Sequence, residues 1–200
     1  MIGRGIGGVT KRKIMKVIAL NPNAEGMITQ IAQLLVIGFK YSWPDMASAL
    51  EEVQDCLEPS RINRLAVAEG DIVVGWIGGR SMYEGHVWDL HPLVVHPDYQ
   101  RQGIGRLLVR DFETQVQARG GITIYLGTDD EDDQTSLAGT DVYPHVLSHL
   151  AQIKNLHGHP YEFYQKMGYV LVGMVPDANG LGKPDILMAR RVGEWELVKG

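Results

Sequence analysis

Residues 91–106 have the sequence HPLVVHPDYQRQGIGR, in which an apolar run is followed by two closely spaced glycines. Residues 87–95 alternate and then become continuously apolar, as in a half-buried strand, and Pro97 and Asp98 are typical of a turn. From residue 107 to residue 118, apolar side chains recur at helical spacing. This stretch therefore predicts a strand, a tight turn and the N-terminus of a helix.

The start of that helix predicts an anion-binding loop. The first N–H groups of a helix have no intrahelical partner, and the helix end carries a partial positive charge. Gly103 and Gly105 let the backbone approach a phosphate closely, and Arg101, Arg106 and Arg110 add full charges. Glycine spacing alone is weak evidence in a chain with 24 glycines, so an ordinary strand–turn–helix connection is the alternative.

Composition excludes several classes of protein. The 200 residues suit a single domain, and no apolar run approaches the ~20 residues that span a membrane. A formal net charge of −5 disfavours nucleic acid as a partner and favours cationic ligands. Cys56 is the only cysteine, which excludes an internal disulfide and indicates a reducing compartment such as the cytoplasm.

The N-terminal segment differs from the rest of the chain. Residues 1–14 contain Gly3, Gly5 and Gly8 at the spacing of a dinucleotide-binding loop, but no strand precedes them. We therefore expect residues 1–14 to be a disordered leader or a cloning remnant, and residues 15–200 to form one domain.

The order of elements predicts an α/β (α+β) fold with a mixed central sheet and helices on both faces. Gly78 and Gly79 are expected to open a loop that carries Tyr83. We expect strands at residues 15–20, 65–68, 72–77, 87–95, 122–126, 169–175 and 185–191. We expect helices at residues 26–40, 47–57, 107–118, 141–150 and 160–167.

Two motifs resemble those of the GNAT superfamily of acetyltransferases. Residues 93–105, LVVHPDYQRQGIG, resemble its acetyl-CoA signature through Gln100, Gly103 and Gly105, and residues 163–169, FYQKMGY, resemble its second hallmark. The resemblance implies six to seven strands, a splay between the two central strands, and acetyl-CoA as acyl donor without a metal. It assigns acetyl-CoA to Leu93, Val94, Val95, Gln100, Arg101, Gln102, Gly103, Ile104, Gly105, Arg106 and Tyr164.

Residues 88–189 are more closely similar to the chromosomal type of aminoglycoside 6′-N-acetyltransferases. The matching strings are WDLHPLVV at 88–95, RGGITIYLGTDD at 119–130, HPYEFY at 159–164 and PDI at 184–186. This resemblance implies direct acetyl transfer to an aminoglycoside 6′-amine in a ternary complex, antibiotic resistance and a homodimer. The first 80 residues match only loosely, chiefly at Trp43 and Pro44.

The resemblance also assigns catalytic residues. Asp89, His91 and Leu93 share one face of their strand because side chains alternate. Asp89 stands where family members carry a glutamate base, and its shorter side chain favours a bridging water; His91, with a reference pKa of ~6.5, is the rival base. Asp89 pairing with a cationic substrate, and His91 orienting backbone, are the structural alternatives.

Two further groups complete the predicted chemistry. The Leu93 backbone N–H corresponds to the oxyanion donor, and Tyr164 to the acid that protonates the departing CoA sulfur. A thiolate with a pKa near ~8.5 is already a tolerable leaving group, so the contribution of Tyr164 is expected to be small. The alternative is that the Tyr164 ring only packs on the pantetheine arm.

The acidic run at residues 129–133 is either a solvated loop or a receptor for a polycation. No acid of this run is expected in the core. We assign Asp129 and Asp130 to substrate binding and leave Asp132 and Asp133 to solvent. Trp43 and Tyr83 are expected to stack on or hydrogen-bond a sugar ring, with burial in the core as the alternative for Trp43.

Three other hypotheses remain beside this one. A GNAT enzyme that acetylates another amine, such as a polyamine or a peptide N-terminus, is the first; the acidic run allows a polyamine, but the similarity over residues 88–189 argues against it. A non-catalytic acyl-CoA sensor needs the phosphate loop but neither Asp89 nor Tyr164. A metal site is not expected, because His145 and His149 are one helical turn apart but lack a third ligand.

Overall fold

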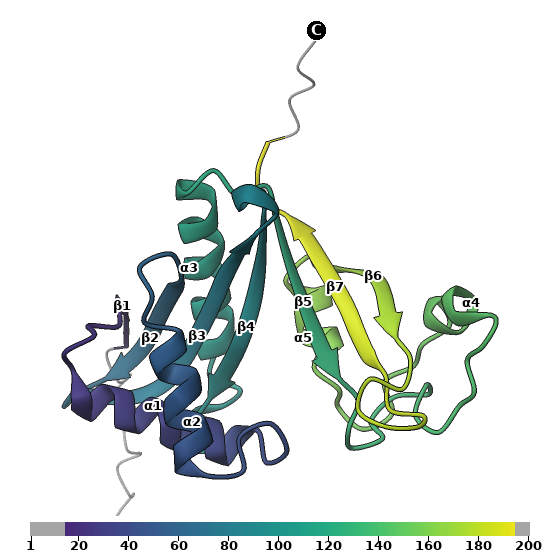
Figure 1. Ribbon diagram of the computed structural model, residues 1–200, viewed down its shortest axis with the longest axis horizontal. Helices are drawn as coiled ribbons and strands as arrows, with labels where there is room; N and C mark the ends of the chain where they lie inside the picture. The colour runs from purple at the N-terminus through teal and green to yellow at the C-terminus, as the bar shows by residue number, and fades with distance from the viewer. Residues whose placement is uncertain (1–14, 195–200) are drawn as a thin grey trace, which may run out of the picture.

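The structure is a computed structural model that describes residues 15–194 (Figure 1). The predicted leader at residues 1–14 lies outside the described residues. The strands are β1 (Lys16–Ala19), β2 (Ile62–Ala68), β3 (Ile72–Met82), β4 (Val87–Val95), β5 (Thr123–Asp129), β6 (Val170–Val175) and β7 (Asp185–Arg191). The helices are α1 (Glu25–Gly38), α2 (Met46–Asp55), α3 (Ile104–Ala118), α4 (Val146–Ala151) and α5 (Tyr161–Lys166), with 3₁₀ turns η1 (Tyr83–Gly85) and η2 (Pro97–Tyr99).

All seven described strands form one mixed sheet in the order β1-β2-β3-β4-β5-β7-β6. Neighbouring strands are antiparallel within the group β1–β4 and within the group β5, β7 and β6. The two groups meet at β4 and β5, which are parallel. This arrangement confirms the predicted mixed α/β fold.

The two central strands separate soon after they meet. Pairing of β4 with β5 is limited to three residue pairs, from Val87↔Thr123 to Asp89↔Tyr125, although β4 continues to Val95. Figure 1 shows the strands diverging below this point like the arms of a V. The predicted splay is confirmed, and it exposes backbone groups along one edge of β4.

Helices cover both faces of the half of the sheet formed by β1–β4. Helices α1 and α2 lie on one face, where Ile31, Leu35 and Trp76 belong to one buried cluster. Helix α3 covers the other face through a second cluster that includes Leu108 and Phe112. Helix α5 packs against β7 in the other half. The prediction of helices on both faces is thus confirmed.

Strand β3 is longer than predicted because its glycines serve packing and not chain reversal. A Cβ atom on Gly79 would lie 2.3 Å from the ring of Phe112, and one on Gly78 would lie 2.7 Å from the carbonyl oxygen of His91. Only glycine lets α3 and β4 approach β3 this closely. The predicted loop at residues 78–79 is therefore wrong, and β3 continues to Met82.

Helix α4 is shorter than predicted. It begins at Val146, not at residue 141, because Pro144 lacks an N–H group and the Asp141 carboxylate accepts a hydrogen bond from the Tyr143 N–H at 3.1 Å. Val142 instead inserts into a small cluster with Leu150. None of the described helices is both long and apolar enough to cross a membrane.

Candidate active site

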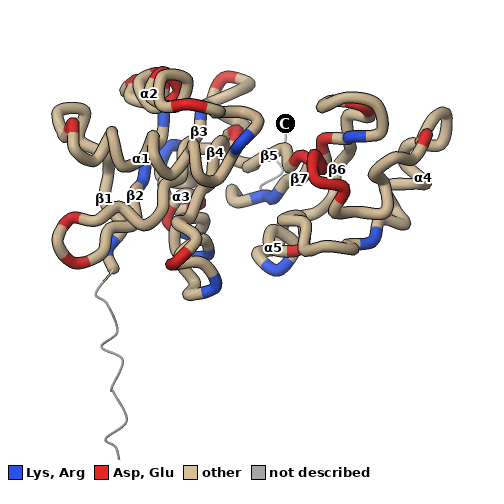
Figure 2. Tube along the Cα trace, turned by 90° about the horizontal axis from the view of Figure 1, so that it is seen from below, with Lys and Arg blue, Asp and Glu red and all other residues tan. Residues whose placement is uncertain are grey.

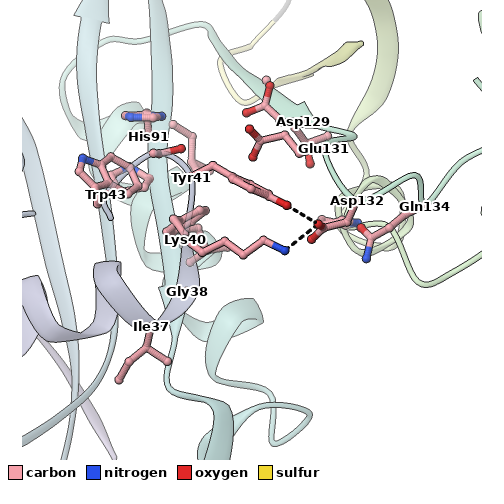
Figure 3. Close-up of a pocket in the computed structure, with 18 of the residues that line it drawn as sticks. Ile37, Gly38, Lys40, Tyr41, Trp43, His91, Asp129, Glu131, Asp132 and Gln134 are labelled. Atoms are coloured by element: carbon pink, nitrogen blue, oxygen red, sulfur yellow. Dashed lines mark hydrogen bonds and ion pairs between the residues drawn. The ribbon is translucent and has the colours of Figure 1, made fainter. Parts of the chain in front are cut away.

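A pocket of about 330 Å³ opens where β4 and β5 separate. Its walls are the end of α1 with the segment that follows (residues 37–43), residues 90–93 of β4, and residues 127–129, 131, 132 and 134 at and after the end of β5, completed by Pro160 and Tyr164. Figure 3 shows these segments facing one another across the gap. The volume lies in the range of small-molecule sites, so the splay creates a site between segments that are distant in sequence.

Acidic side chains line one wall of this pocket. Asp129, Glu131 and Asp132 all contribute to the lining, and Figure 2 shows the acidic run as a red stretch of tube beside the gap. Burial raises the pKa of Glu131, and the neighbouring charges of Asp129 and Asp132 raise it further. Repulsion among carboxylates of this kind is relieved by a bound cation, so the wall is suited to an ammonium group.

Asp130 does not belong to the pocket, contrary to the sequence prediction. It is fully buried, and its carboxylate accepts hydrogen bonds from the Gln134 N–H at 2.6 Å, the Thr135 N–H at 3.0 Å and the Thr135 hydroxyl at 2.6 Å. Three donors compensate the buried charge and close the loop after β5. The expectation that no acid of the run lies in the core is therefore wrong.

Asp132 lines the pocket, as the sequence predicted for Asp130. Its side chain stays exposed there, and its Oδ1 atom is 2.9 Å from Lys40 Nζ. These contacts lower the pKa of Asp132, first through the hydrogen bond from Lys40. The two acids differ because Asp130 is bound by Gln134 and Thr135 of its own loop, whereas Asp132 is paired with Lys40, 92 residues away in sequence.

The two predicted aromatic contacts have different outcomes. Trp43 lines the pocket although only 7% of it is exposed, and its ring packs 5.7 Å from that of His91 and 5.1 Å from that of Phe39. Tyr83 is 72% exposed and lies outside the pocket lining. Because β3 extends to Met82, Tyr83 is carried to the closed end of the splay, away from the pocket.

Asp89 lies where β4 and β5 are still paired, and it has a partner that the sequence analysis missed. Arg80 faces Asp89 from β3, and its guanidinium atoms Nε and Nη2 each lie 3.0 Å from Asp89 Oδ2. Asp89 is 7% exposed and does not line the pocket itself. Since Arg80 occupies Oδ2, Oδ1 is left to accept a further hydrogen bond, as the expected bridging water requires.

Asp185 is a second residue that the sequence analysis missed. It faces Asp129 across β5 and β7, and its carboxylate lies so close to Gly127 that a Cβ there would be 2.4 Å from Oδ2. Burial, followed by the charges of Asp129 and Asp89, raises the pKa of Asp185 to about 6. Its Oδ1 atom is buried without a hydrogen-bond partner among the described residues.

The Leu93 N–H is directed into the splay. N–H groups along a strand alternate in direction, and the His96 N–H donates to the Val74 carbonyl on β3. Leu93 lies three residues before His96, and β4 pairs regularly with β3 as far as Leu93 and Ile77. An odd number of residues reverses the direction, so the Leu93 N–H points away from β3 toward the gap. This orientation is the one that an oxyanion donor needs.

Tyr164, on α5, approaches the pocket from the opposite arm of the splay. Burial raises the pKa of its hydroxyl, which therefore stays protonated and available as a donor at neutral pH. Its ring packs against those of Phe163 and Tyr169 at centroid distances of 5.1 and 5.6 Å.

His91 is exposed and lines the pocket from β4.

The predicted anion loop has the expected local geometry. Gly103 adopts φ +87° at the start of α3 and provides no side-chain cap. The first intrahelical bond runs from the Leu107 N–H to the Gly103 carbonyl at 3.0 Å, so the N–H groups of residues 104–106 have no acceptor within the helix. The site of a Cβ on Gly105 is 3.4 Å from the Phe163 ring, so the two sequence motifs meet across the splay.

The described residues contain no group of three or more His, Cys, Asp or Glu side chains arranged to hold a metal. His159, just before α5, is buried, and its Nε2 is 3.1 Å from the Asp129 carbonyl oxygen. Burial lowers the pKa of His159, which therefore remains neutral and braces the acidic segment.

Comparison with known proteins agrees with this geometry. The model of the acetyltransferase (GNAT) family matches residues 28–138, more than half of the chain. The chain belongs to the GNAT family. This assignment confirms the resemblance to the GNAT superfamily, and residues 93–105 lie within the matched range.

Solved GNAT structures show a closer likeness. An aminoglycoside 6′-N-acetyltransferase complexed with coenzyme A is 42% identical, with a TM-score of 0.86, over 90% of this GNAT chain and 99% of that chain. The aminoglycoside 6′-N-acetyltransferase from Enterococcus faecium is also 42% identical over the same shares, with a TM-score of 0.83. A curated acetyltransferase of Pectobacterium atrosepticum is 35% identical over 69 residues, which cover 34% of this chain and 47%, about half, of that relative.

Proposed function

We propose that this GNAT enzyme transfers the acetyl group of acetyl-CoA to the 6′-amine of aminoglycoside antibiotics and thereby confers resistance. The observation that carries the proposal is the acid-lined pocket at the splay, into which both Leu93 and Tyr164 face. The 42% identity to two aminoglycoside 6′-N-acetyltransferases supports the choice of substrate class. We further propose that residues 15–200 form the single catalytic domain.

Acetyl-CoA as donor fits the residues on the α3 side of the splay. The unpaired N–H groups of residues 104–106 suit a pyrophosphate, with Arg101 and Arg106 nearby, while Gln100 and Gln102 brace the loop through hydrogen bonds to the carbonyls of Val95 and Asp98 at 3.2 and 3.0 Å. In this arrangement the thioester supplies the activated acetyl group, and the edge of β4 orients it.

The chain's own residues then perform three tasks. His91, or Asp89 through a water on its free Oδ1, accepts the proton that the attacking ammonium must lose. As the amine nitrogen bonds to the acetyl carbon, the Leu93 N–H donates to the carbonyl oxygen; donors of this kind contribute ~3 kcal/mol to transition-state stabilisation. When the C–S bond breaks, Tyr164 gives a proton to the thiolate.

The substrate side of the pocket fits a polycationic sugar. Asp129, Glu131 and Asp132 provide a wall for ammonium groups, and Trp43 provides an apolar ring beside His91. The same wall also fits a polyamine or a basic peptide N-terminus, which is the second candidate function. We assign the enzyme to the cytoplasm, and Cys56, which is buried, suits a reducing compartment.

We also propose that the enzyme is a homodimer. Strand β6 is an edge of the sheet, and it exposes Val170, Val172 and Val175, with exposed fractions of 60, 52 and 47%. A long apolar edge strand favours pairing with another chain. Analytical ultracentrifugation of the enzyme and of a Val172→Lys variant tests this proposal, because a lysine at the edge is expected to give a monomer.

The experiment that tests the reaction is release of free CoA, detected with a thiol-reactive dye. Kanamycin A, which carries a 6′-amine, is expected to release CoA, whereas an analogue with a 6′-hydroxyl group is not. Loss of turnover in Asp89→Asn and Tyr164→Phe variants separates an enzyme from an acyl-CoA sensor. Turnover with spermidine but with no aminoglycoside would replace the proposed substrate by a polyamine.

A further inference from the structure

One ion pair crosses the mouth of the pocket. Lys40, after α1, and Asp132, after β5, are 92 residues apart in sequence, yet Lys40 Nζ is 2.9 Å from Asp132 Oδ1. The Tyr41 hydroxyl donates to the same oxygen at 3.3 Å, and Lys40 Nζ lies 4.4 Å from the centroid of the Tyr41 ring. In Figure 3 these contacts are the dashed lines that join the two walls.

This ion pair contributes little to stability. The Lys40 and Asp132 side chains are 61% and 53% exposed, and pairs this exposed to solvent are weak and screened by salt. A soluble ammonium group can therefore compete with Lys40 for the Asp132 carboxylate.

The other acids of the wall are not neutralised in the same way. The Lys183 ammonium donates to the backbone carbonyl of Glu131, not to a carboxylate, and Asp129 Oδ1 accepts a hydrogen bond from the neutral Asn179 amide at 2.5 Å. Glu131 forms no ion pair among the described residues, and the charges of Asp129 and Asp132 both act on it. Lys40 thus neutralises one acid of the wall and leaves two for a ligand.

We propose that Lys40 is a specificity-determining residue that occupies the Asp132 carboxylate as an internal ammonium, so that substrates bind there by displacing it. The proposal rests on the proposed function. Exchange of one ammonium for another gains little, so a monoamine obtains no net attraction at Asp132. A substrate with several ammonium groups also engages Asp129 and Glu131, which Lys40 does not neutralise. Lys40 therefore favours polycations over singly charged amines.

The test compares Lys40→Met, which keeps the aliphatic stem, with Lys40→Arg, which keeps the charge. For kanamycin A, Lys40→Met is expected to lower KM about 2- to 5-fold at low salt with kcat unchanged, whereas Lys40→Arg behaves as the unmodified enzyme. For a monoamine acceptor the gain in kcat/KM is expected to be larger than for kanamycin A. An increase in KM, or a fall in kcat, would show that the pair only shapes the pocket and would overturn the proposal.

Two controls separate displacement from a general change in charge. Lys183→Met removes a nearby positive charge that does not occupy Asp132, and it is expected to change KM by less than Lys40→Met does. In an Asp132→Asn background, Lys40→Met is expected to have no effect on KM, because there is no carboxylate to release. An undiminished gain in that background would overturn the proposal.

Failure of the proposed function leaves a distinct signature. If the unmodified enzyme releases no CoA with any aminoglycoside, the substrate assignment fails, and the same variants are then compared for spermine binding by titration calorimetry. Tighter spermine binding by Lys40→Met, abolished in the Asp132→Asn background, supports the role of Lys40 without turnover. Equal spermine affinity in all variants would overturn it.

Discussion

The two halves of the sheet differ in what surrounds them. Strands β1–β4 are covered on both faces, by α1 and α2 on one side and by α3 on the other, and their large buried side chains include Trp76 and Phe112. In the half formed by β5–β7, the loop after β5 buries Asp130, and Asp185 lies half-buried against β5. Apolar burial thus dominates the first half, whose buried carboxylates Asp89 and Glu113 are paired with Arg80 and Arg190. In the second half, Asp130 and Asp185 form no ion pair among the described residues, and the pocket lies at the junction of the two halves.

The largest expected effect tests the apolar half. Phe112→Ala removes a fully buried ring that packs between α3 and the glycines of β3, and we expect it to cost about 3–5 kcal/mol of unfolding free energy. Leu181→Ala, in the exposed turn between β6 and β7, is the matched control and is expected to cost less than about 0.5 kcal/mol. Urea denaturation measures both; equal losses would contradict the division between the halves.

The next effect tests the junction. Leu93→Pro removes the N–H that faces the gap without removing a hydrogen bond to β3, so we expect kcat to fall about 10²- to 10³-fold while the fold is retained. Leu93→Ala keeps the N–H and is expected to retain most of kcat. Steady-state kinetics with circular dichroism as a folding check measures both, and an active proline variant would exclude Leu93 as the oxyanion donor.

A third comparison uses two acids of the same loop. Asp130→Asn places an amide against the Gln134 and Thr135 donors, and we expect it to cost about 1–3 kcal/mol of unfolding free energy with KM unchanged in the folded fraction. Asp132→Asn is expected to leave stability unchanged and to raise KM for kanamycin A by no more than about 5-fold, because Lys40 already occupies this exposed carboxylate. Thermal melts and kinetics on both variants separate the roles; a KM effect only in Asp130→Asn would restore the original assignment.

The smallest effect concerns pH. The pKa of Asp185 is raised to about 6, so above pH 6 the folded state holds a partly buried negative charge that the unfolded state exposes to water. Below the unfolded pKa, near 3.8, the carboxyl is neutral in both states and the cost vanishes. Asp185→Asn is therefore expected to stabilise the protein by about 1 kcal/mol at pH 8, a value reduced for solvent screening, and by nothing near pH 3.5.

Melting temperatures measured across this pH range test the sign of the effect. An Asp185→Asn variant that is stabilised most at low pH would contradict the burial of an ionisable carboxyl at this position. Asp98→Asn, which alters an exposed carboxylate of η2, is the matched control.

Most of the fold was predictable because its signals are local. Alternation in residues 87–95, helical spacing after residue 107 and the glycines at 103 and 105 each depend only on neighbours in the chain. The same holds for the N–H groups of the anion loop, which any helix start leaves unpaired. Gly78 and Gly79 indicate a loop when only their neighbours in the chain are considered. In the fold they make room for the Phe112 ring and for the backbone of β4, so the strand continues through them.

The sequence alone was enough to recognise the order of elements, the two acetyltransferase motifs and the acidic run. The folded chain was needed to show which of those acids lines the pocket and which caps a loop, since Thr135 donates to Asp130 and Lys40 is paired with Asp132. It likewise placed Arg80 on Asp89 and Asp185 behind Gly127. The physical reason is that a carboxylate's role follows from the donors and charges that surround it, and most of these come from other strands and loops.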